Sequence, residues 1–363
     1  MKDLKIKRID KYIIKQFLGT FVFILSGLIL IVVVFDVNEK LDKFMAPEVT
    51  LKEILLDYYV NFIPYFISMF SSLFTFIAVI FFTSKLADRS EIIAMLSAGM
   101  SFNRLMYPYI ISATIIAISM FTLSAYVIPP ANAKRLDFEY NYIKKNKKPE
   151  RARSVQLEVE PGVIAYFDSY DNKSKMGYRF SLYRFEGKTL VSRLTANSIK
   201  YDSLYNWTVI DYIIRDFDGM HEKISSGTRI DTTLMFMPQD FLIAEDDCET
   251  MTNPQLSEFI GRQKQRGIGN IQMFEIEYHR RIANAFSYFI LTAIGVSLSS
   301  RKKKGGMGLN IGVGLGLSFS YILFTTVTSS FAVSGMVSPF VACWIPNIVY
   351  TLIAIYLYRK APK

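Results

Sequence analysis

Hydrophobic and polar positions divide this chain into two groups of long uncharged runs, with about 150 mostly polar residues between them. Each uncharged run is close to the ~20 apolar residues that a helix needs to cross the ~30 Å hydrocarbon core of a bilayer. Four such runs cover residues 17–35, 58–84, 105–133 and 282–300. A fifth uncharged stretch, residues 305–358, is too long for one crossing, and turn residues at 334–339 divide it in two. The pattern predicts an α-helical polytopic membrane protein with six transmembrane helices and a domain inserted between helices 3 and 4.

The first run, residues 17–35, could also be a cleaved signal peptide. It is longer than the apolar core of a usual signal peptide, and no small-residue cleavage site follows it. We therefore expect it to be a retained membrane anchor.

Basic residues are concentrated on one side of the predicted spans and account for the chain's net charge of +10. The residues before span 1, the loops joining spans 2–3 and 4–5, and the carboxyl-terminal tail are each net positive, whereas the loop after span 1 is net negative. Because cytoplasmic loops carry the excess of Lys and Arg, both termini are expected in the cytoplasm and the insert outside. The charge therefore needs no nucleic acid to explain it.

The insert changes to period-two alternation between about residues 154 and 241, which is typical of strands. Five segments rich in Val, Ile, Tyr and Phe show it: residues 155–160, 163–170, 177–185, 198–203 and 207–217. Short strands at this spacing favour an antiparallel sandwich or open barrel of jelly-roll type. Such a domain could bury its own core, or it could expose an apolar face that holds acyl chains, and alternation alone does not separate the two.

A highly charged segment precedes these strands, and a predicted helix over residues 254–266, ended by residues 267–270, follows them. The expected domains are residues 1–133 with spans 1–3, residues 134–280 with the β-rich domain, and residues 281–363 with spans 4–6.

The loop between spans 2 and 3 predicts a short amphipathic helix over residues 88–99. Asp88 and Glu91 have the spacing of a capping box, and Gly99 can end the helix. Four positions share one face: Ile92, Met95, Leu96 and Gly99. This face could insert into a cleft of a soluble partner, or the helix could lie on the lipid surface.

Two stripes with four-residue spacing lie within predicted spans. Small residues permit close approach of another helix, from this chain or from a partner; they are Gly308, Gly312, Gly316 and Ser320. Aromatic residues could line a cavity for acyl chains, or they could face lipid or a neighbouring helix; they are Phe62, Phe66, Phe70 and Phe74.

Lys40 and Lys43 lie just beyond span 1, three residues apart and thus on one helical face. At headgroup level they could contact lipid phosphates, or they could simply extend toward water. No GxxxxGK[ST] loop occurs in the chain, so ATP would have to be bound by another subunit.

Catalytic and metal-binding patterns are weak. The two cysteines, Cys248 and Cys343, fall in the insert and in span 6, so no disulfide framework is expected. A membrane-embedded lipid-modifying enzyme could use Asp168, Asp171 or His221, but no spacing specifies a reaction. A scaffold that anchors an envelope domain is a further alternative, although six spans exceed what an anchor needs.

Several motifs in a fixed order resemble the LptF/LptG family, the permease subunits of the lipopolysaccharide export ABC transporter. They are IKRIDKYIIKQFLGTF at the amino end, SEIIAMLSAGMS between spans 2 and 3, EYHRRIA before span 4, GGMGLNIGVGLGLSFSY in span 5 and CWIPNIVY in span 6. The chain departs from the family at Ala285 and Phe286, where members often have a proline, and in span 2, where only Pro64 is present.

The resemblance implies a non-catalytic subunit of the bacterial inner membrane. The loop helix would dock into a cytoplasmic ATPase dimer, which binds ATP and Mg, so this chain would need no cofactor. The docking residues would be Arg89, Glu91, Ile92, Met95, Leu96 and Gly99. A second permease subunit of the family would form lateral gates with spans 1 and 5, at Gly308, Gly312 and Gly316.

The same resemblance places lipopolysaccharide between the two permeases. Its phosphates would lie near Lys40 and Lys43, and its acyl chains near the phenylalanine stripe of span 2. The β-domain would be a periplasmic jelly roll with an open apolar groove. It would pass the lipid to bridge proteins, one of them anchored by a single span.

Overall fold

A computed structural model describes these residues of the chain: 6–143, 151–219, 221–242, 245–265, 271–300 and 306–361. The chain forms two compact units. The helical unit comprises Met1–Ile143, Glu249–Asn253 and Gln272–Lys363, and the β unit comprises Lys144–Cys248 and Pro254–Ile271. A short piece of the insert therefore belongs to the helical unit.

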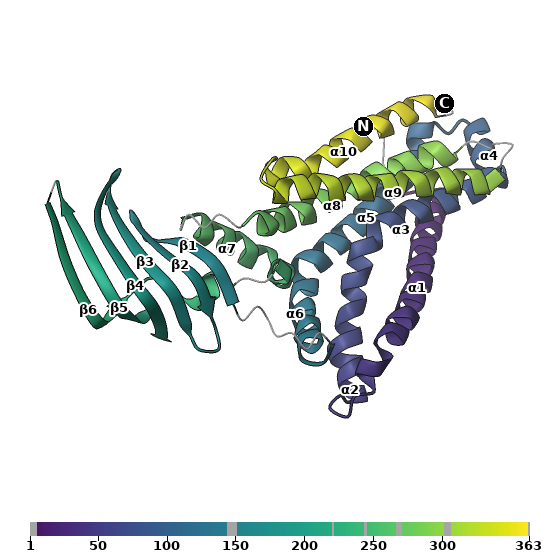
Figure 1. Ribbon diagram of the computed structural model, residues 1–363. Helices are drawn as coiled ribbons and strands as arrows, with labels where there is room; N and C mark the ends of the chain where they lie inside the picture. The colour runs from purple at the N-terminus through teal and green to yellow at the C-terminus, as the bar shows by residue number, and fades with distance from the viewer. Residues whose placement is uncertain are drawn as a thin grey trace. The chain divides into compact units, whose positions relative to one another are not determined.

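The first half of the helical unit contains three long helices (Figure 1). The first is α1 (Arg8–Phe44). The second joins α2 (Leu51–Glu53), a π-helical turn η1 (Ile54–Tyr59) and α3 (Val60–Asp88). The third joins α5 (Phe102–Thr122), the π-helical turn η2 (Leu123–Val127), α6 (Ile128–Phe138) and the π-helical turn η3 (Glu139–Ile143).

The second half contains α8 (Gln272–Ser299), α9 (Gly306–Val333) and α10 (Pro339–Lys360). The expected break of the long uncharged stretch is confirmed between α9 and α10, where Gly335 has a φ of 77°. Six helices among the described residues are long and apolar enough to cross a membrane, as the hydrophobic pattern predicted. The basic loop at residues 301–304 lies outside the described residues.

Close contacts hold the helices together. Side chains at four-residue spacing on α1 are buried against α3 and α5; they are Ile13, Phe17, Phe21 and Leu25. Gly295 brings α8 against α3, because a Cβ there would lie 2.7 Å from the Val79 side chain. Gly314 brings α9 against Ile80 of α3 in the same way. The small residues of α8 and α9 therefore let both helices pack closely on α3.

The β unit contains a six-stranded antiparallel sheet whose strands neighbour one another in sequence order. The strands are β1 (Arg151–Glu160), β2 (Val163–Asp171), β3 (Met176–Glu186), β4 (Thr189–Ser203), β5 (Asn206–Asp218) and β6 (His221–Thr233). The antiparallel β-domain between helices 3 and 4 is thus confirmed. Two parts of the sheet were not predicted, the first half of β4 and all of β6. Most residues of β6 are exposed, so it lacks the apolar alternation that marks a half-buried strand.

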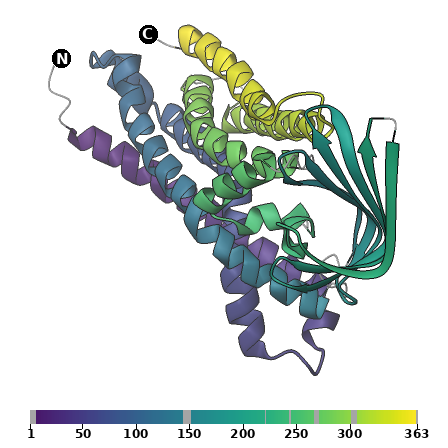
Figure 2. The ribbon, with the colours of Figure 1, turned by 90° about the vertical axis from the view of Figure 1, so that its left-hand side faces the viewer.

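A crease crosses the sheet at one level of every strand. Ser154, Arg179 and Asp211 have φ angles of 50°, 54° and 54° in alternate strands. One residue per strand lies outside the ladder pairing at this level: Ser154, Asp168, Arg179, Asn197, Asp211 and Thr228. These residues lie opposite one another in neighbouring strands, so the ladder is interrupted across the sheet at this level without a shift of register. The strands bend strongly in Figure 2.

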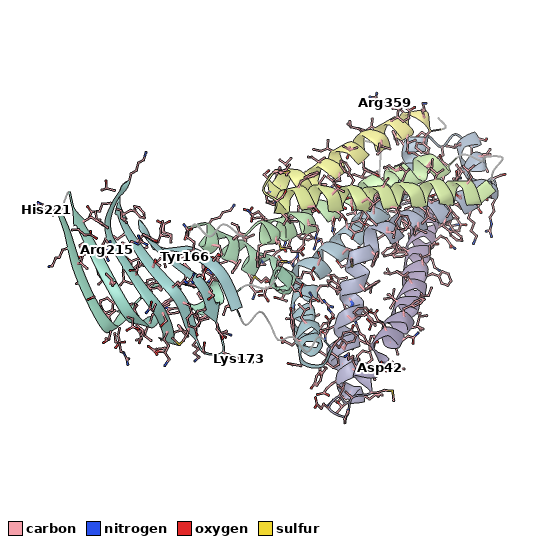
Figure 3. All side chains as sticks on the ribbon, viewed as in Figure 1. Asp42, Tyr166, Lys173, Arg215, His221 and Arg359 are labelled. Atoms are coloured by element: carbon pink, nitrogen blue, oxygen red, sulfur yellow. The ribbon has the colours of Figure 1, made fainter. Side chains whose placement is uncertain are left out.

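One face of the sheet packs on the chain segment that follows β6. Trp207 is buried there, and its indole N–H donates to the Phe236 carbonyl at 3.1 Å. Phe167 and Tyr170 pack against Phe241 of the same segment. The edge strand β6 is less covered, since most of its residues are exposed, and it begins at His221, which is labelled in Figure 3. The helix α7 (Asn253–Gln265) follows, as predicted, although the residues expected to end it lie outside the described ones.

Candidate functional site

The predicted loop helix is present as α4 (Glu91–Ser97), and it is shorter than expected. Asp88 does not cap it, because Asp88 is the last residue of α3. Ser90 takes the N-cap position instead, with a φ of 60°, so the chain turns sharply between the two helices. Gly99 ends the loop helix as predicted, with a φ of 86° and its N–H donating to the Leu96 carbonyl at 3.0 Å.

The two faces of α4 differ from the sequence-based interpretation. Ile92 is fully buried among residues of α1, α3 and α5, and Met95 and Leu96 pack against the same cluster. The face that was expected to reach a partner therefore packs within this chain. The opposite face carries Ile93, which is 49% exposed. Exposed neighbours extend this face; they are Arg89, Ala94 and Ser97.

Glu91 links α4 to the first helix. The Tyr12 hydroxyl of α1 donates to the Glu91 carboxylate at 3.3 Å. Tyr12 was not among the predicted site residues, because a residue 79 positions earlier gives no local signal of this contact. The hydrogen bond therefore connects α4 directly to α1.

An ion pair joins the beginning of α1 to the beginning of α5. The Arg104 guanidinium binds the Asp10 carboxylate with two hydrogen bonds of 2.7 and 2.5 Å. Asp10 is 1% exposed and also accepts from the Lys7 backbone N–H at 2.7 Å. Tyr358, near the end of α10, hydrogen-bonds to Asn103 beside this pair. The ends of three membrane helices and α4 are therefore tied together at one end of the bundle.

Lys40, a predicted phosphate contact, is already paired inside the chain. Its ammonium lies 2.5 Å from the Asp36 carboxylate, and it contacts the Tyr58 hydroxyl. The Tyr58 and Tyr59 hydroxyls each donate to Asp36 at 3.1 Å. These neighbouring tyrosines converge on one carboxylate from the π-helical turn η1, a feature that is frequent at functional sites. Lys43 is exposed on the same helix, so it is the more accessible of the two lysines.

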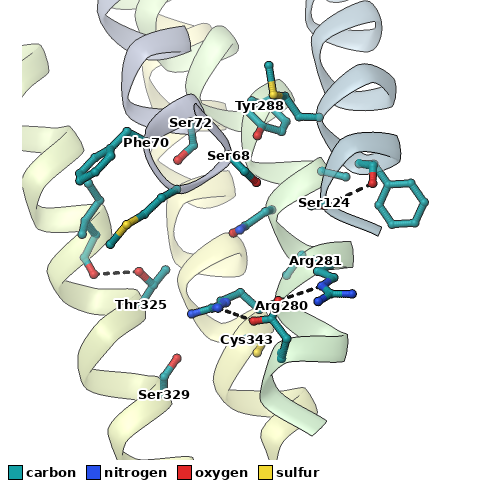
Figure 4. Close-up of a pocket in the computed structure, with 18 of the residues that line it drawn as sticks. Ser68, Phe70, Ser72, Ser124, Arg280, Arg281, Tyr288, Thr325, Ser329 and Cys343 are labelled. Atoms are coloured by element: carbon teal, nitrogen blue, oxygen red, sulfur yellow. Dashed lines mark hydrogen bonds and ion pairs between the residues drawn. The ribbon is translucent and has the colours of Figure 1, made fainter. Parts of the chain in front are cut away.

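The phenylalanine stripe of α3 forms a continuous run of ring contacts. Ring centroids lie 5.4 Å apart for Phe62 and Phe66, 4.8 Å for Phe66 and Phe70, and 6.5 Å for Phe70 and Phe74. The stripe packs against apolar residues of α1. Phe62 and Phe74 are each 7% exposed, so these two rings are buried within the chain. Phe70 lies in the lining of a cavity of the helical unit (Figure 4), as the interpretation of a cavity-lining stripe requires of it.

The glycine stripe of α9 faces away from the rest of the chain. A side chain added at Gly308, Gly312 or Gly316 would meet no atom of the described residues within 4 Å. Gly314, between them, provides the close contact within the chain. The predicted stripe is thus available to another molecule, as the interpretation of a seam between subunits requires.

A cavity of about 280 Å³ lies inside the helical unit (Figure 4). Hydroxyl groups line part of it, including Ser68 and Ser72 of α3, Ser124 of η2 and Thr325 of α9. Arg280 of α8 lies at one end, where it binds the Glu277 carboxylate. Apolar side chains such as Phe70 and Ile322 line the rest, so the cavity presents both polar and apolar groups.

A network of charged residues surrounds that end of the cavity. Its members are Asn132, Arg135, Glu139, Glu249, Glu277, Arg280 and Arg281. Arg135 binds Glu139 at 2.5 Å and Asn132 at 2.7 Å, and its guanidinium lies over the Tyr65 ring at 4.5 Å. Burial raises the pKa of Glu249, and the nearby Glu277 carboxylate adds to this effect. None of these residues was predicted as a site, because their partners come from separate segments.

Residues 11–360 match the family model described as "Lipopolysaccharide export system permease LptF/LptG". The chain belongs to this family. The permease is therefore a multi-pass membrane protein of lipopolysaccharide export, and the resemblance inferred from its motifs is confirmed over nearly the whole chain. No curated protein matches it.

The family motifs of the permease correspond to contacts in the structure. Asn347 of the WIPN motif donates to the Ala283 carbonyl of α8 at 2.8 Å and accepts from the Tyr321 hydroxyl of α9 at 2.9 Å. Asn347 therefore connects α8, α9 and α10. The SEIIAMLSAGMS motif supplies Ile92 to the core and leaves Ile93 exposed. Asn347 and Ile92 thus both lie where helices of this chain meet.

Proposed function

We propose that the permease is a non-catalytic transmembrane subunit of an ATP-driven transporter that extracts lipopolysaccharide from the bacterial inner membrane. The family match over residues 11–360 carries this proposal. The positive-inside rule supports both termini in the cytoplasm and the β unit in the periplasm. ATP and Mg would be bound by a separate cytoplasmic ATPase dimer.

The ATPase would dock on the exposed face of α4, around Ile93 and Arg89. Two features support this location. The face is apolar and partly exposed at Ile93, and Glu91 at its edge is hydrogen-bonded to Tyr12 of α1. Closure of the ATPase would thus move α4 and α1 together.

A second permease of the same family would pack on the outward stripe of Gly308, Gly312 and Gly316. Small residues allow close helix approach, and this stripe has no neighbour within the described chain. Lipid would enter between the two permeases, with Lys43 available to its phosphates. The β unit would pass the lipid to periplasmic bridge proteins, one of them anchored by a single span.

Purification from mild detergent followed by mass spectrometry tests the assembly. We expect a soluble ATPase, a second family permease and a bound glycolipid to copurify. Reconstitution with these partners should give ATP-dependent release of lipid from vesicles. Lipid release by this chain alone, without ATP, or purification without any ATPase under conditions that preserve the bundle, would refute the proposal.

Two variants separate docking from the link to α1. Tyr12→Phe removes the hydrogen bond to Glu91 and keeps the carboxylate charge, whereas Glu91→Gln removes the charge and keeps a hydrogen-bond acceptor. If the Glu91 charge binds the ATPase, Glu91→Gln should lower ATPase copurification and Tyr12→Phe should not. Equal effects of both variants on copurification would contradict the docking role of the charge.

A further inference from the structure

The segment Glu249–Asn253 has an unusual position in the chain. Residues on both sides of it, up to Cys248 and from Pro254 onward, belong to the β unit, whereas the segment itself belongs to the helical unit. The chain therefore returns to the helical bundle for five residues in the middle of the insert. The covalent connections at Ile143 and Gln272 alone do not require this return.

Arg281 of α8 holds the returning segment. One terminal nitrogen of its guanidinium donates to the Met251 carbonyl at 2.8 Å and to the Asn253 side-chain oxygen at 2.9 Å. The Nε–H donates to the Glu277 carboxylate, one helical turn earlier, at 2.8 Å. The Arg281 side chain is 5% exposed. A buried guanidinium with a carboxylate on one edge and the segment on the other has a fixed orientation.

A second contact ties the same segment to α6. The Asn132 side chain donates to the Glu249 carboxylate at 3.2 Å, and Arg280 lies 4.0 Å from the same carboxylate. Asn132 is itself held by Arg135 at 2.7 Å. The segment is thus attached at its first residue to α6 and at its third and fifth residues to α8, which are helices from the two halves of the bundle.

We propose that Arg281 is a positioning residue that transmits movement of α8 to the β unit through Glu249–Asn253. Because the segment is fixed to Arg281 by two hydrogen bonds, a displacement of this part of α8 carries the segment with it. The β-unit chain continues directly from both ends of the segment. This inference rests on the proposed transport function, in which the β unit receives lipid from the bundle.

The test measures lipid transferred to an acceptor per ATP hydrolysed, using the complete transporter in lipid vesicles. Arg281→Gln removes the charge and its fixed fork, and Asn253→Ala removes one acceptor without changing the buried charges. Arg281→Lys retains a cation and restores part of the contact. Arg262→Gln in α7 is the matched control, since Arg262 is 61% exposed and lies 4.0 Å from Glu258.

For Arg281→Gln we expect the transfer per ATP to fall about fivefold or more, the lower range of measured coupling between sites. The rate of ATP hydrolysis and the amounts of copurified partners should both stay within about twofold of those of the unaltered permease, below the coupling expected for Arg281→Gln. Asn253→Ala should give a smaller fall in the same ratio, Arg281→Lys should recover part of it, and Arg262→Gln should leave it unchanged.

Two results would overturn the proposal. If folded Arg281→Gln or Asn253→Ala transporters keep the normal transfer per ATP, the contact transmits nothing. If transfer and ATP hydrolysis fall in parallel, Arg281 only stabilises the fold. If the Arg281→Gln transporter does not assemble, the amount of lipid transferred per ATP by the Asn253→Ala transporter decides between these outcomes. Failure of the proposed function itself would look different, because the unaltered transporter would then release no lipid with ATP.

Discussion

The ion pair between Asp10 and Arg104 should be a large single contribution to the stability of the bundle. Asp10 is 1% exposed, and both of its carboxylate oxygens accept hydrogen bonds from the Arg104 guanidinium. Arg104→Gln would leave the buried carboxylate with the Lys7 N–H but without a balancing charge. Removing one partner of a buried pair costs about 3–5 kcal/mol.

The expected cost lies at the lower end of that range. The Arg104 side chain is 29% exposed, so water already screens part of the interaction. We expect Arg104→Gln to lower the free energy of unfolding by about 3 kcal/mol. The double variant Asp10→Asn/Arg104→Gln keeps hydrogen-bonding groups and removes both charges, so its cost should be about 1 kcal/mol.

A double-mutant cycle measures this coupling, with unfolding followed by SDS titration in mixed micelles. The single variants should each be less stable than the double variant. With a cost of about 3 kcal/mol for Arg104→Gln and about 1 kcal/mol for the double variant, the coupling energy should then exceed about 3 kcal/mol. Additive effects, or an Arg104→Gln cost below about 0.5 kcal/mol, would show that the pair does not hold α1 to α5. The exposed pair of Arg229 and Asp231 serves as a control, because surface pairs contribute about 0–1 kcal/mol.

Three further predictions concern α4, the charged network and the crease. Ile93→Ala should change stability by less than about 0.5 kcal/mol and reduce copurification of the ATPase, whereas Ile92→Ala should cost about 2–5 kcal/mol in thermal unfolding. Glu249→Gln should raise the melting temperature at pH 7, and this gain should shrink as the pH falls toward 4.5. The reason is that the pKa of Glu249 is raised in the folded protein, so its contribution to stability is lost as the pH rises and the carboxyl ionises. A difference in melting temperature that does not depend on pH would refute this cause. Arg179→Gly should stabilise the β unit by about 0.5–1 kcal/mol, since glycine takes its φ of 54° without a steric penalty, and a loss of stability on denaturant unfolding would contradict this reasoning.

The membrane helices could be predicted from the sequence because their signal is local. A run of about 20 uncharged residues is sufficient evidence of a span, and the break near Gly335 follows from turn residues in the printed sequence. The same reasoning failed for β6. Its apolar residues are few, and Ile224 is 59% exposed, so no buried face imposes a period of two.

The faces of α4 show a different limit. Ile92 and Ile93 are adjacent, so either could belong to the apolar face at helical spacing. Only the packing of α4 on α1, α3 and α5 decides that Ile92 points inward. The N-cap of α4 was assigned wrongly for a related reason. The sequence around Asp88 is compatible both with the start of a new helix and with the end of the preceding one, and the structure shows that Asp88 ends α3.

Contacts between distant segments were beyond the sequence pattern altogether. Lys40 resembles a free headgroup ligand in the sequence, but in the structure it is paired with Asp36, which also accepts hydrogen bonds from Tyr58 and Tyr59 of η1. The glycine stripe was visible as a spacing, whereas the inward role of Gly314 depends on Ile80 of another helix. Spacing therefore identifies which residues could meet something, and packing determines what they meet.

A buried ion pair near one end of α1 and hydrogen bonds to a buried carboxylate near the other constrain how this helix can move. Asp10 near one end is paired with Arg104 of α5, and Asp36 near the other end accepts from the tyrosines that precede α3. Between these ties, large apolar side chains of α1 are exposed, with Phe23 at 79% and Phe35 at 70%. Separation of α1 from α5 would leave the Asp10 carboxylate without Arg104, at a cost of about 3–5 kcal/mol if it stays buried. Movement of α1 together with α3 and α5 breaks neither the ion pair nor these hydrogen bonds, so an opening along the exposed face of α1 is cheapest when these helices move as one body.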